Sequence, residues 1–146
     1  MPLKILIVDD NMDDLELLPR TLSKMPEITS PALEAMDDAS CQEHLGNEPG
    51  IDCILLDYSL PGQDGLKVLE KFLERDPTMA VVMITGQGDE AIAVAAMKAG
   101  AQDYLTKETI SVANLKRAIS NATERSNMQR KILDQQESLQ SFAQVI

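Results

Sequence analysis

The chain has 146 residues, 44% of them hydrophobic and 25% charged, which is typical of one globular domain with a buried core. Its formal net charge of −11 argues against direct binding of nucleic acid, which requires a basic surface. No apolar run is long enough to cross a membrane, and the run Ile5–Val8 is too short for the core of a signal peptide. Cys41 and Cys53 have no metal-binding or redox spacing, so we expect reduced thiols in a cytoplasmic protein.

Short apolar runs alternate with helical patterns along the chain, and Pro or Gly residues punctuate them. In chain order, the expected elements are strand Leu3–Val8, helix Asn11–Lys24 with a kink at Pro19, strand Ser30–Met36, helix Asp38–Leu45 ended by Gly46, strand Cys53–Asp57, helix Asp64–Arg75, strand Ala80–Thr85, helix Asp89–Ala99, strand Tyr104–Thr106 and a helix from Ser111 to the end. Five strands that alternate with helices predict an α/β fold, with a doubly wound, five-stranded parallel sheet covered by helices on both faces.

The fold is organised around the stretch from Ile51 to Gly65, in which the apolar run Cys53–Leu56 ends on Asp57. A continuous apolar run followed by a turn at Pro61-Gly62 is typical of a strand buried on both faces of a parallel sheet. Ligands of open α/β sheets bind at the carboxyl ends of such strands. Asp57 is therefore a candidate for chemistry, although by itself it could simply begin a solvated loop.

Three further expected strands also end in polar residues, at Asp9-Asp10, Thr85 and Lys107. The carboxyl ends of parallel strands share one edge, so these side chains and Asp57 should converge. Clustered carboxylates favour a hard divalent cation, and Mg²⁺ is the natural candidate. A lysine and a hydroxyl opposite would complete a clamp for phosphoryl transfer. Each residue also has an ordinary explanation, since the aspartates could cap the first helix and the others could merely end strands.

Four stretches together resemble the receiver (response regulator) domains of two-component signalling systems, over roughly Pro2 to Ala122. They read I-L-I-V-D-D, L-L-D-Y-S-L-P-G-Q-D-G, V-M-I-T-G and A-M-K-A-G-A-Q-D-Y-L-T-K. The resemblance implies a flavodoxin-like fold and a phosphoprotein that takes its phosphoryl group from a histidine kinase or phosphotransfer protein. The implied roles are phosphoacceptor for Asp57, Mg²⁺ ligands for Asp9, Asp10, Asp57 and the backbone carbonyl of Ser59, phosphoryl contacts for Thr85 and Lys107, and aromatic switch for Tyr104.

Other functions are compatible with parts of this pattern. An aspartate-nucleophile phosphatase usually needs a second aspartate two residues after the first, where this chain has Ser59. A flavodoxin-like mononucleotide binder should have a first loop rich in Gly, Ser and Thr, but the acidic residues after Val8 would repel phosphate. A module that interacts without phosphorylation is the remaining alternative. We expect no enzymatic activity beyond self-catalysed phosphoryl acceptance and hydrolysis.

The C-terminal helix carries two apolar stripes with different phases, which divides the chain into a receiver domain at 1–122 and a linker or signalling helix at 123–146. The first stripe, Val112, Leu115, Ile119 and Ala122, should pack on the sheet. The second follows heptad spacing and suits parallel pairing with a second copy as a coiled coil, although a solvated helix is the alternative; its members are Met128, Ile132, Leu139, Phe142 and Ile146, with polar Arg125 and Gln135. The run Glu137–Ile146 resembles the approach to the dimerisation helix of sensor histidine kinases, which implies a covalently linked output domain in a longer protein.

Overall fold

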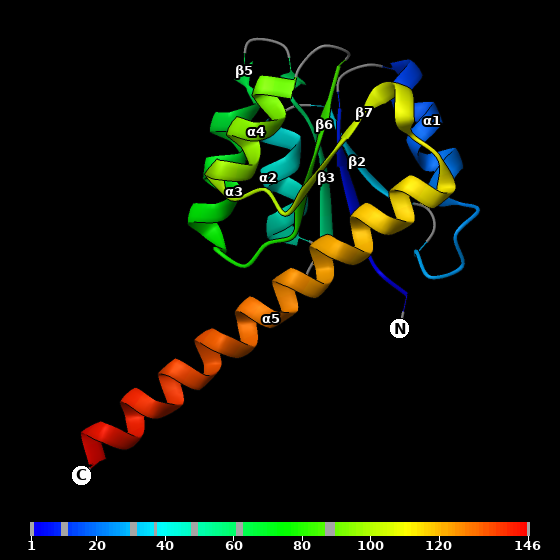
Figure 1. Ribbon diagram of the computed structural model, residues 1–146. Coiled ribbons are helices and arrows are strands. Elements are labelled where there is room, and N and C mark those ends of the chain that lie inside the picture. Colours follow the sequence, from blue (N-terminus) through cyan, green and yellow to red (C-terminus); the bar gives the residue numbers. More distant parts are fainter. Residues whose placement is uncertain are drawn as a thin grey trace.

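The computed structural model describes residues 2–9, 12–29, 32–36, 38–47, 50–60, 63–86 and 90–145. Its centre is a five-stranded, all-parallel sheet in the order β2-β1-β3-β6-β7 (Figure 1). The strands are β1 (Ile5–Val8), β2 (Leu33–Ala35), β3 (Cys53–Asp57), β6 (Val81–Thr85) and β7 (Asp103–Thr106). A separate antiparallel pair joins β4 (Ser59–Leu60) to β5 (Gln63–Asp64). The doubly wound α/β architecture expected from the sequence is confirmed.

Helices cover both faces of the sheet (Figure 1). They are α1 (Met12–Leu22), α2 (Asp38–Asn47), α3 (Gly65–Arg75), α4 (Glu90–Ala99) and α5 (Val112–Val145), with a 3₁₀ turn, η1, at Lys107–Thr109. Buried residues of α1 and α5 pack on one face, whereas those of α2, α3 and α4 pack on the other. The central strands are consequently shielded from water on both sides.

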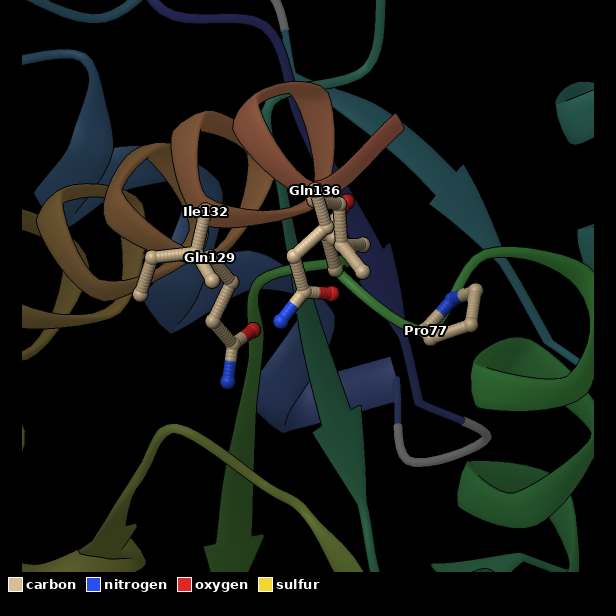
Figure 2. A pocket seen from close by; sticks show the side chains of 6 residues that line it. Pro77, Gln129, Ile132 and Gln136 are labelled. Atoms are coloured by element: carbon tan, nitrogen blue, oxygen red, sulfur yellow. The ribbon is translucent and has the colours of Figure 1, made fainter. Parts of the chain in front are cut away.

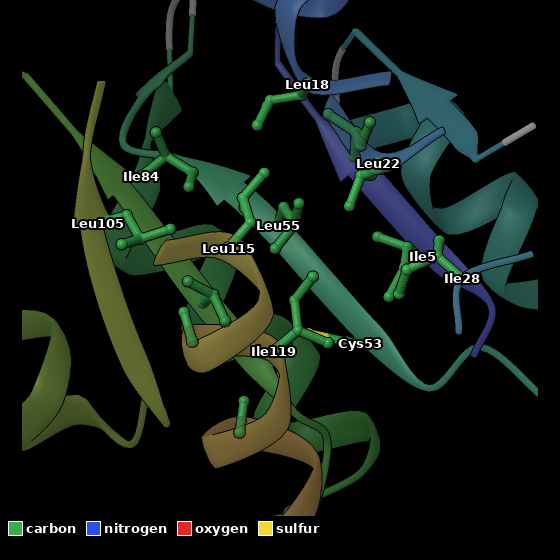
Figure 3. Close-up of a cluster of buried hydrophobic side chains, with 14 of the residues drawn as sticks. Ile5, Leu18, Leu22, Ile28, Cys53, Leu55, Ile84, Leu105, Leu115 and Ile119 are labelled. Atoms are coloured by element: carbon green, nitrogen blue, oxygen red, sulfur yellow. The ribbon is translucent and has the colours of Figure 1, made fainter. Parts of the chain in front are cut away.

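This double shielding explains why the central strands β1, β3 and β6 consist almost entirely of apolar residues. Successive side chains of a strand point to opposite faces: in β1, Ile5 and Ile7 belong to the cluster under α1 and α5, and Leu6 and Val8 belong to the other. Figure 3 shows the first cluster, in which Leu115 and Ile119 of α5 lie over the sheet. Burial of one such side chain contributes roughly 1.5–3 kcal/mol, so the two clusters dominate the stability of the fold.

Local signals set the bounds of α3. The Asp64 carboxylate accepts a hydrogen bond from the backbone N–H of Leu66 at 2.9 Å and caps the start of the helix. Val68, Leu69 and Phe72 form its buried face. At the other end, the N–H of Asp76 donates to the carbonyl of Phe72 at 2.9 Å. Asp76 also contacts α5, through Arg130.

Several elements differ in detail from the expectations. The second strand is only three residues long, and α2 continues through Gly46 instead of ending there. A helix tolerates glycine where its conformation is available, at a modest cost. The β4–β5 pair was not expected from the sequence. α1 continues past Pro19, which has no N–H to donate and so leaves one carbonyl of the preceding turn without its helical partner.

α5 is one helix of 34 residues that extends well beyond the sheet (Figure 1). Its N-terminus is capped by Ser111, whose hydroxyl accepts a hydrogen bond from the N–H of Asn114 at 3.1 Å. Leu115, Ile119 and Ala122 are buried as expected, but Val112 is 37% exposed and Ala118 takes the remaining core position. Val112 is the first residue of the helix. No helix in the described part of the chain is long and apolar enough to cross a membrane.

Candidate functional site

Strand register brings the predicted site residues to one edge of the sheet. Val8 of β1 pairs with Leu56 of β3, so Asp9 and Asp57 follow side by side. Asp57 pairs with Ile84 of β6, and Thr85 pairs with Thr106 of β7. Lys107 comes directly after Thr106. Four groups that are widely separated in sequence therefore meet at the carboxyl edge.

Asp57 and Lys107 are in direct contact at this edge. The ammonium Nζ of Lys107 lies 3.3 Å from Oδ2 of Asp57. The other carboxylate oxygen, Oδ1, accepts a hydrogen bond from the N–H of Ser59 at 3.1 Å. The Asp57 side chain is only 2% exposed, whereas Lys107 is 27% exposed. Low exposure strengthens the attraction between the two charges, and the lysine side chain is partly exposed beside the buried carboxylate.

Asp9 lies next to this pair and is also buried. Its backbone N–H donates to the carbonyl of Ala35 at 2.9 Å, which ties the end of β1 to β2. Asp10, the second acid of the predicted metal site, lies outside the described residues. Within the described ranges no group of three or more His, Cys, Asp or Glu side chains is arranged to hold a metal. The described carboxylates of Asp9 and Asp57 are hard oxygen donors, which match the preference of Mg²⁺.

Thr85 and Tyr104 lie on the same face of the sheet. Tyr104 pairs with Met83 of β6, and Met83 and Thr85 are two residues apart, so their side chains project to one side. Thr85 is 1% exposed, and its hydroxyl lies 3.5 Å from the carbonyl oxygen of Leu105. Tyr104 is 44% exposed and lines a surface hollow of about 360 Å³ with residues of β7 and α5. Tyr104 is therefore not a buried core aromatic in this structure.

Gly65 is a site-supporting residue that the sequence reasoning did not single out. A Cβ atom at this position would lie 2.6 Å from Cα and 2.7 Å from the carbonyl oxygen of Tyr58, the residue that follows Asp57. Only glycine permits this close approach of two backbone segments. The β4–β5 pair, in which Ser59 faces Asp64, closes the same loop. The Asp64-Gly65 dipeptide was the only available sequence signal.

Neither cysteine takes part in this edge. Cys41 and Cys53 are buried and form no disulfide. Burial, with a smaller contribution from the charge of Asp52, raises the pKa of the Cys53 thiol to about 12. A thiol with such a pKa carries almost no thiolate at neutral pH and is a poor nucleophile. Cys53 is a core residue.

Comparison with known proteins agrees with this architecture. A family model described as the response regulator receiver domain matches residues 5–120. The chain is 32% identical over 107 residues to the chemotaxis protein CheY of Treponema pallidum (strain Nichols), covering 73% of each protein. It is 38% identical over 119 residues to the response regulator protein PilR of Pseudomonas aeruginosa, covering 82% of this chain and 26% of PilR. This chain thus spans about a quarter of the PilR sequence.

Solved structures show the same likeness. The crystal structure of NtrX from Brucella abortus superposes with a TM-score of 0.79 at 31% identity, over 92% of this chain and 29% of NtrX. A response regulator receiver domain protein from Clostridium thermocellum gives a TM-score of 0.75 at 31% identity, over 86% of this chain and 98% of its own. The fold is that of CheY-like receivers. The chain belongs to the response regulator receiver domain family of two-component systems.

Proposed function

We propose that Asp57 accepts a phosphoryl group from the phosphohistidine of a histidine kinase or phosphotransfer protein. The observation that carries the proposal is the contact of 3.3 Å between Lys107 Nζ and Asp57 Oδ2, made at the strand edge where Asp9 and Thr85 also converge. A buried carboxylate beside an ammonium is suited to receive a dianionic group, because the ammonium offsets the added charge. Membership of the receiver family supports the same role.

In the proposed reaction, a carboxylate oxygen of Asp57 attacks the phosphorus atom of phosphohistidine in line with the P–N bond. The new O–P bond forms as the P–N bond breaks, and the bonding electron pair leaves with the imidazole nitrogen. Lys107 stabilises the negative charge on the transferring group, and the N–H of Ser59 keeps Asp57 oriented through its bond to Oδ1. The acyl phosphate is later hydrolysed at the same edge, and we propose no further enzymatic activity.

We propose that Asp9, Asp10, Asp57 and the backbone carbonyl of Ser59 hold Mg²⁺. The buried, all-oxygen character of Asp9 and Asp57 supports this ligand set. The ion would supply positive charge next to the transferring phosphoryl oxygens. Without such a cation, placing roughly 1.5–2 additional negative charges beside two buried carboxylates would be strongly unfavourable. The acids and Lys107 therefore act as one charge-balanced set.

The proposed response begins at Thr85 and Tyr104. After phosphorylation, the Thr85 hydroxyl moves toward the new oxygens, and the exposed Tyr104 ring rotates inward on the same face of the sheet. This biases an equilibrium between two existing conformations. The hollow beside Tyr104 is lined by residues of β7, η1 and the start of α5, and it belongs to the surface that we propose would change, together with α4. That surface is the proposed readout.

We propose that α5 relays the change to an output domain of a longer, cytoplasmic protein. The short coverage of PilR and NtrX supports a linked output, since each of those chains continues well beyond the matched part. Met128 and Ile132 are 63% and 52% exposed on the projecting helix, which supports pairing with the α5 of a second copy. The polar members Arg125 and Gln135 are exposed as well, whereas Leu139, Phe142 and Ile146 lie at positions whose side chains or whole residues are outside the described part.

Incubation with acetyl phosphate and Mg²⁺, followed by intact-protein mass spectrometry, tests the proposal. The wild type should gain one phosphoryl group, and Asp57→Asn should gain none. Asp134→Asn, which removes an exposed carboxylate of α5, should be labelled like the wild type, and chelation of Mg²⁺ should abolish labelling. Equal labelling of the wild type and Asp57→Asn would refute Asp57 as acceptor. Absence of labelling in both would favour the interaction module that works without phosphorylation.

A further inference from the structure

The helix α5 stays attached to the domain beyond the end of its apolar stripe. Its buried apolar residues end at Ala122, yet Ser126, one turn further along, is only 2% exposed. At 3.6 residues per turn, Ser126 and Arg130 continue the face that carries Leu115, Ile119 and Ala122. Polar contacts replace apolar packing on this stretch.

The contacts are made with the loop between α3 and β6. The Ser126 hydroxyl donates to the carbonyl of Thr78. Arg130 donates from Nε to the Thr78 hydroxyl at 2.9 Å, and its Nη2 lies 3.5 Å from Oδ2 of Asp76. Thr78 is 4% exposed, so the carbonyl and the hydroxyl it offers to the helix are largely removed from water. A buried acceptor that loses its donor is costly to leave unsatisfied.

Hydrogen bonds within the loop hold Asp76 and Thr78 in the positions from which they contact the helix. Oδ1 of Asp76 accepts hydrogen bonds from the N–H and the hydroxyl of Thr78, at 2.9 and 2.7 Å. Although partial burial alone would raise the pKa of Asp76, the hydrogen bonds from Thr78 and the charge of Arg130 outweigh it and hold the pKa below 3.8. The carboxylate is thus ionised at neutral pH and orients both Thr78 and Arg130.

Gln102, in the loop before β7, forms hydrogen bonds with the neighbouring side of the same stretch of helix. Nε2 of Gln102 donates to Oε1 of Gln129 at 3.1 Å, and the Gln102 carbonyl accepts from Nη1 of Arg125 at 3.3 Å. Gln102 directly precedes β7, just as the Asp76–Thr78 loop precedes β6. These two strands carry Thr85 and lead to Lys107 at their opposite ends.

The polar contacts between α5 and the two loops end at Arg130. Every residue from 131 to 137 is exposed. Figure 2 shows Ile132 and Gln136 of the helix and Pro77 of the loop, which line a pocket of about 300 Å³. Within the described part of the chain, the contacts of Arg130 are therefore the last hydrogen bond and ion pair between α5 and the domain.

We propose that Ser126 and Arg130, together with Asp76 and Thr78, form a polar latch that fixes how α5 leaves the domain. The latch makes the stretch from Thr123 to Arg130 a rigid part of the receiver. The part of α5 that is free to contact partners therefore begins at Lys131. Because the latch loop and Gln102 lie at the amino ends of β6 and β7, the direction of the helix is set by the same strands that carry the candidate switch. This inference does not depend on phosphorylation of Asp57.

Hydrogen–deuterium exchange of the unphosphorylated full chain, resolved to short peptides by mass spectrometry, tests the latch. In the wild type, slow exchange should extend through Arg130 and give way to fast exchange from Lys131 onward. Arg130→Met should raise the exchange rate between Thr123 and Arg130 by about tenfold, since one charge-assisted hydrogen-bonding group is lost from a local opening equilibrium. Exchange between Val112 and Ala122 should stay slow.

Lys131→Met is the matched control, because it removes one positive charge and introduces the same side chain one position along the helix. Its exchange pattern should equal that of the wild type. Thr78→Val keeps the shape of the side chain but removes the hydroxyl, so it should also raise the exchange rate between Thr123 and Arg130. Its melting temperature checks that the variant is folded. A wild-type boundary of slow exchange at Ala122, or equal exchange in Arg130→Met and Lys131→Met, would overturn the latch.

Discussion

Two carboxylate–cation pairs lie at opposite edges of the sheet, and they differ in what surrounds them. At the carboxyl edge, Asp57 and Lys107 are 3.3 Å apart, and the carboxylate is 2% exposed. At the amino edge, Asp76 and Arg130 are 3.5 Å apart, and both side chains are more than a third exposed, at 35% and 45%. The distances are similar, but the burial is not.

The difference teaches what each pair can do. Asp76 is held by two hydrogen bonds from Thr78 and by Arg130, so its charge is stabilised and its position is fixed. An exposed pair of this kind adds only modest stability by itself, and its value lies in geometry. Asp57 lies buried beside a second acid, Asp9, so that added negative charge there must be balanced. One edge is suited to structure and the other to chemistry.

The largest expected effect comes from removing the positive charge of Lys107 at the carboxyl edge of the sheet. Lys107→Met should lower the rate at which acetyl phosphate labels Asp57 by about 100-fold, the usual cost of losing one group that stabilises charge in the transition state. Mass spectrometry over a time course measures the rate. Lys98→Met, which removes an exposed lysine from the last turn of α4, should leave it unchanged. If the two variants were labelled equally fast, the proposed role of Lys107 would be wrong.

The second effect concerns the loop that follows Asp57. Gly65→Ala would place a methyl group 2.6 Å from the backbone of Tyr58, and we expect a loss of about 1–3 kcal/mol in the free energy of unfolding, measured by urea denaturation. Gly46→Ala is the control, since a Cβ at that helical position meets nothing within 4 Å. It should stabilise the protein by about 0.5–1 kcal/mol. Equal stability of the two variants would show that the close approach is easily relieved.

The smallest effect is expected for the Asp76–Arg130 pair at the amino edge of the sheet, and it depends on pH. The pKa of Asp76 is lower in the folded protein than its ordinary value of 3.8. Its ionised form therefore contributes stability above pH 3.8, and this contribution disappears as the pH falls through the lowered pKa. Asp76→Asn should be less stable than the wild type at neutral pH, and the difference should shrink below pH 3.8. Urea denaturation at each pH measures the difference in stability between the two proteins. A difference that stayed constant below pH 3.8 would contradict this assignment.

The strands were largely predictable because burial on both faces imposes a local pattern. Cys53–Asp57 was expected with the bounds that the structure has, and continuous apolar runs led to β1 and β6 within one or two residues. Strand ends then located the candidate site, since Asp57 and Thr85 each end such a run and Lys107 follows the expected strand Tyr104–Thr106. The short β2 was less well defined, because an edge strand needs only one apolar face and its neighbouring prolines blur the signal.

Other features depended on contacts between distant segments. Helical spacing placed Val112 in the core stripe, but the position of the first turn relative to the sheet left it 37% exposed and gave the place to Ala118. The need for glycine at position 65 arises from Tyr58, on a different segment of the loop. No periodicity in the sequence could indicate that Thr78 and Arg130, 52 residues apart, would bond to each other.

By itself, the sequence determined the α/β class, the order of strands and helices, and the set of acids, hydroxyl and lysine that follow the strands, because these depend on short-range patterns of apolar and polar residues. The packing of the folded chain sets how close Lys107 comes to Asp57, leaves Tyr104 exposed and brings Arg130 to Thr78. Such properties depend on distances between segments far apart in the chain, and those distances are fixed only when the whole core packs.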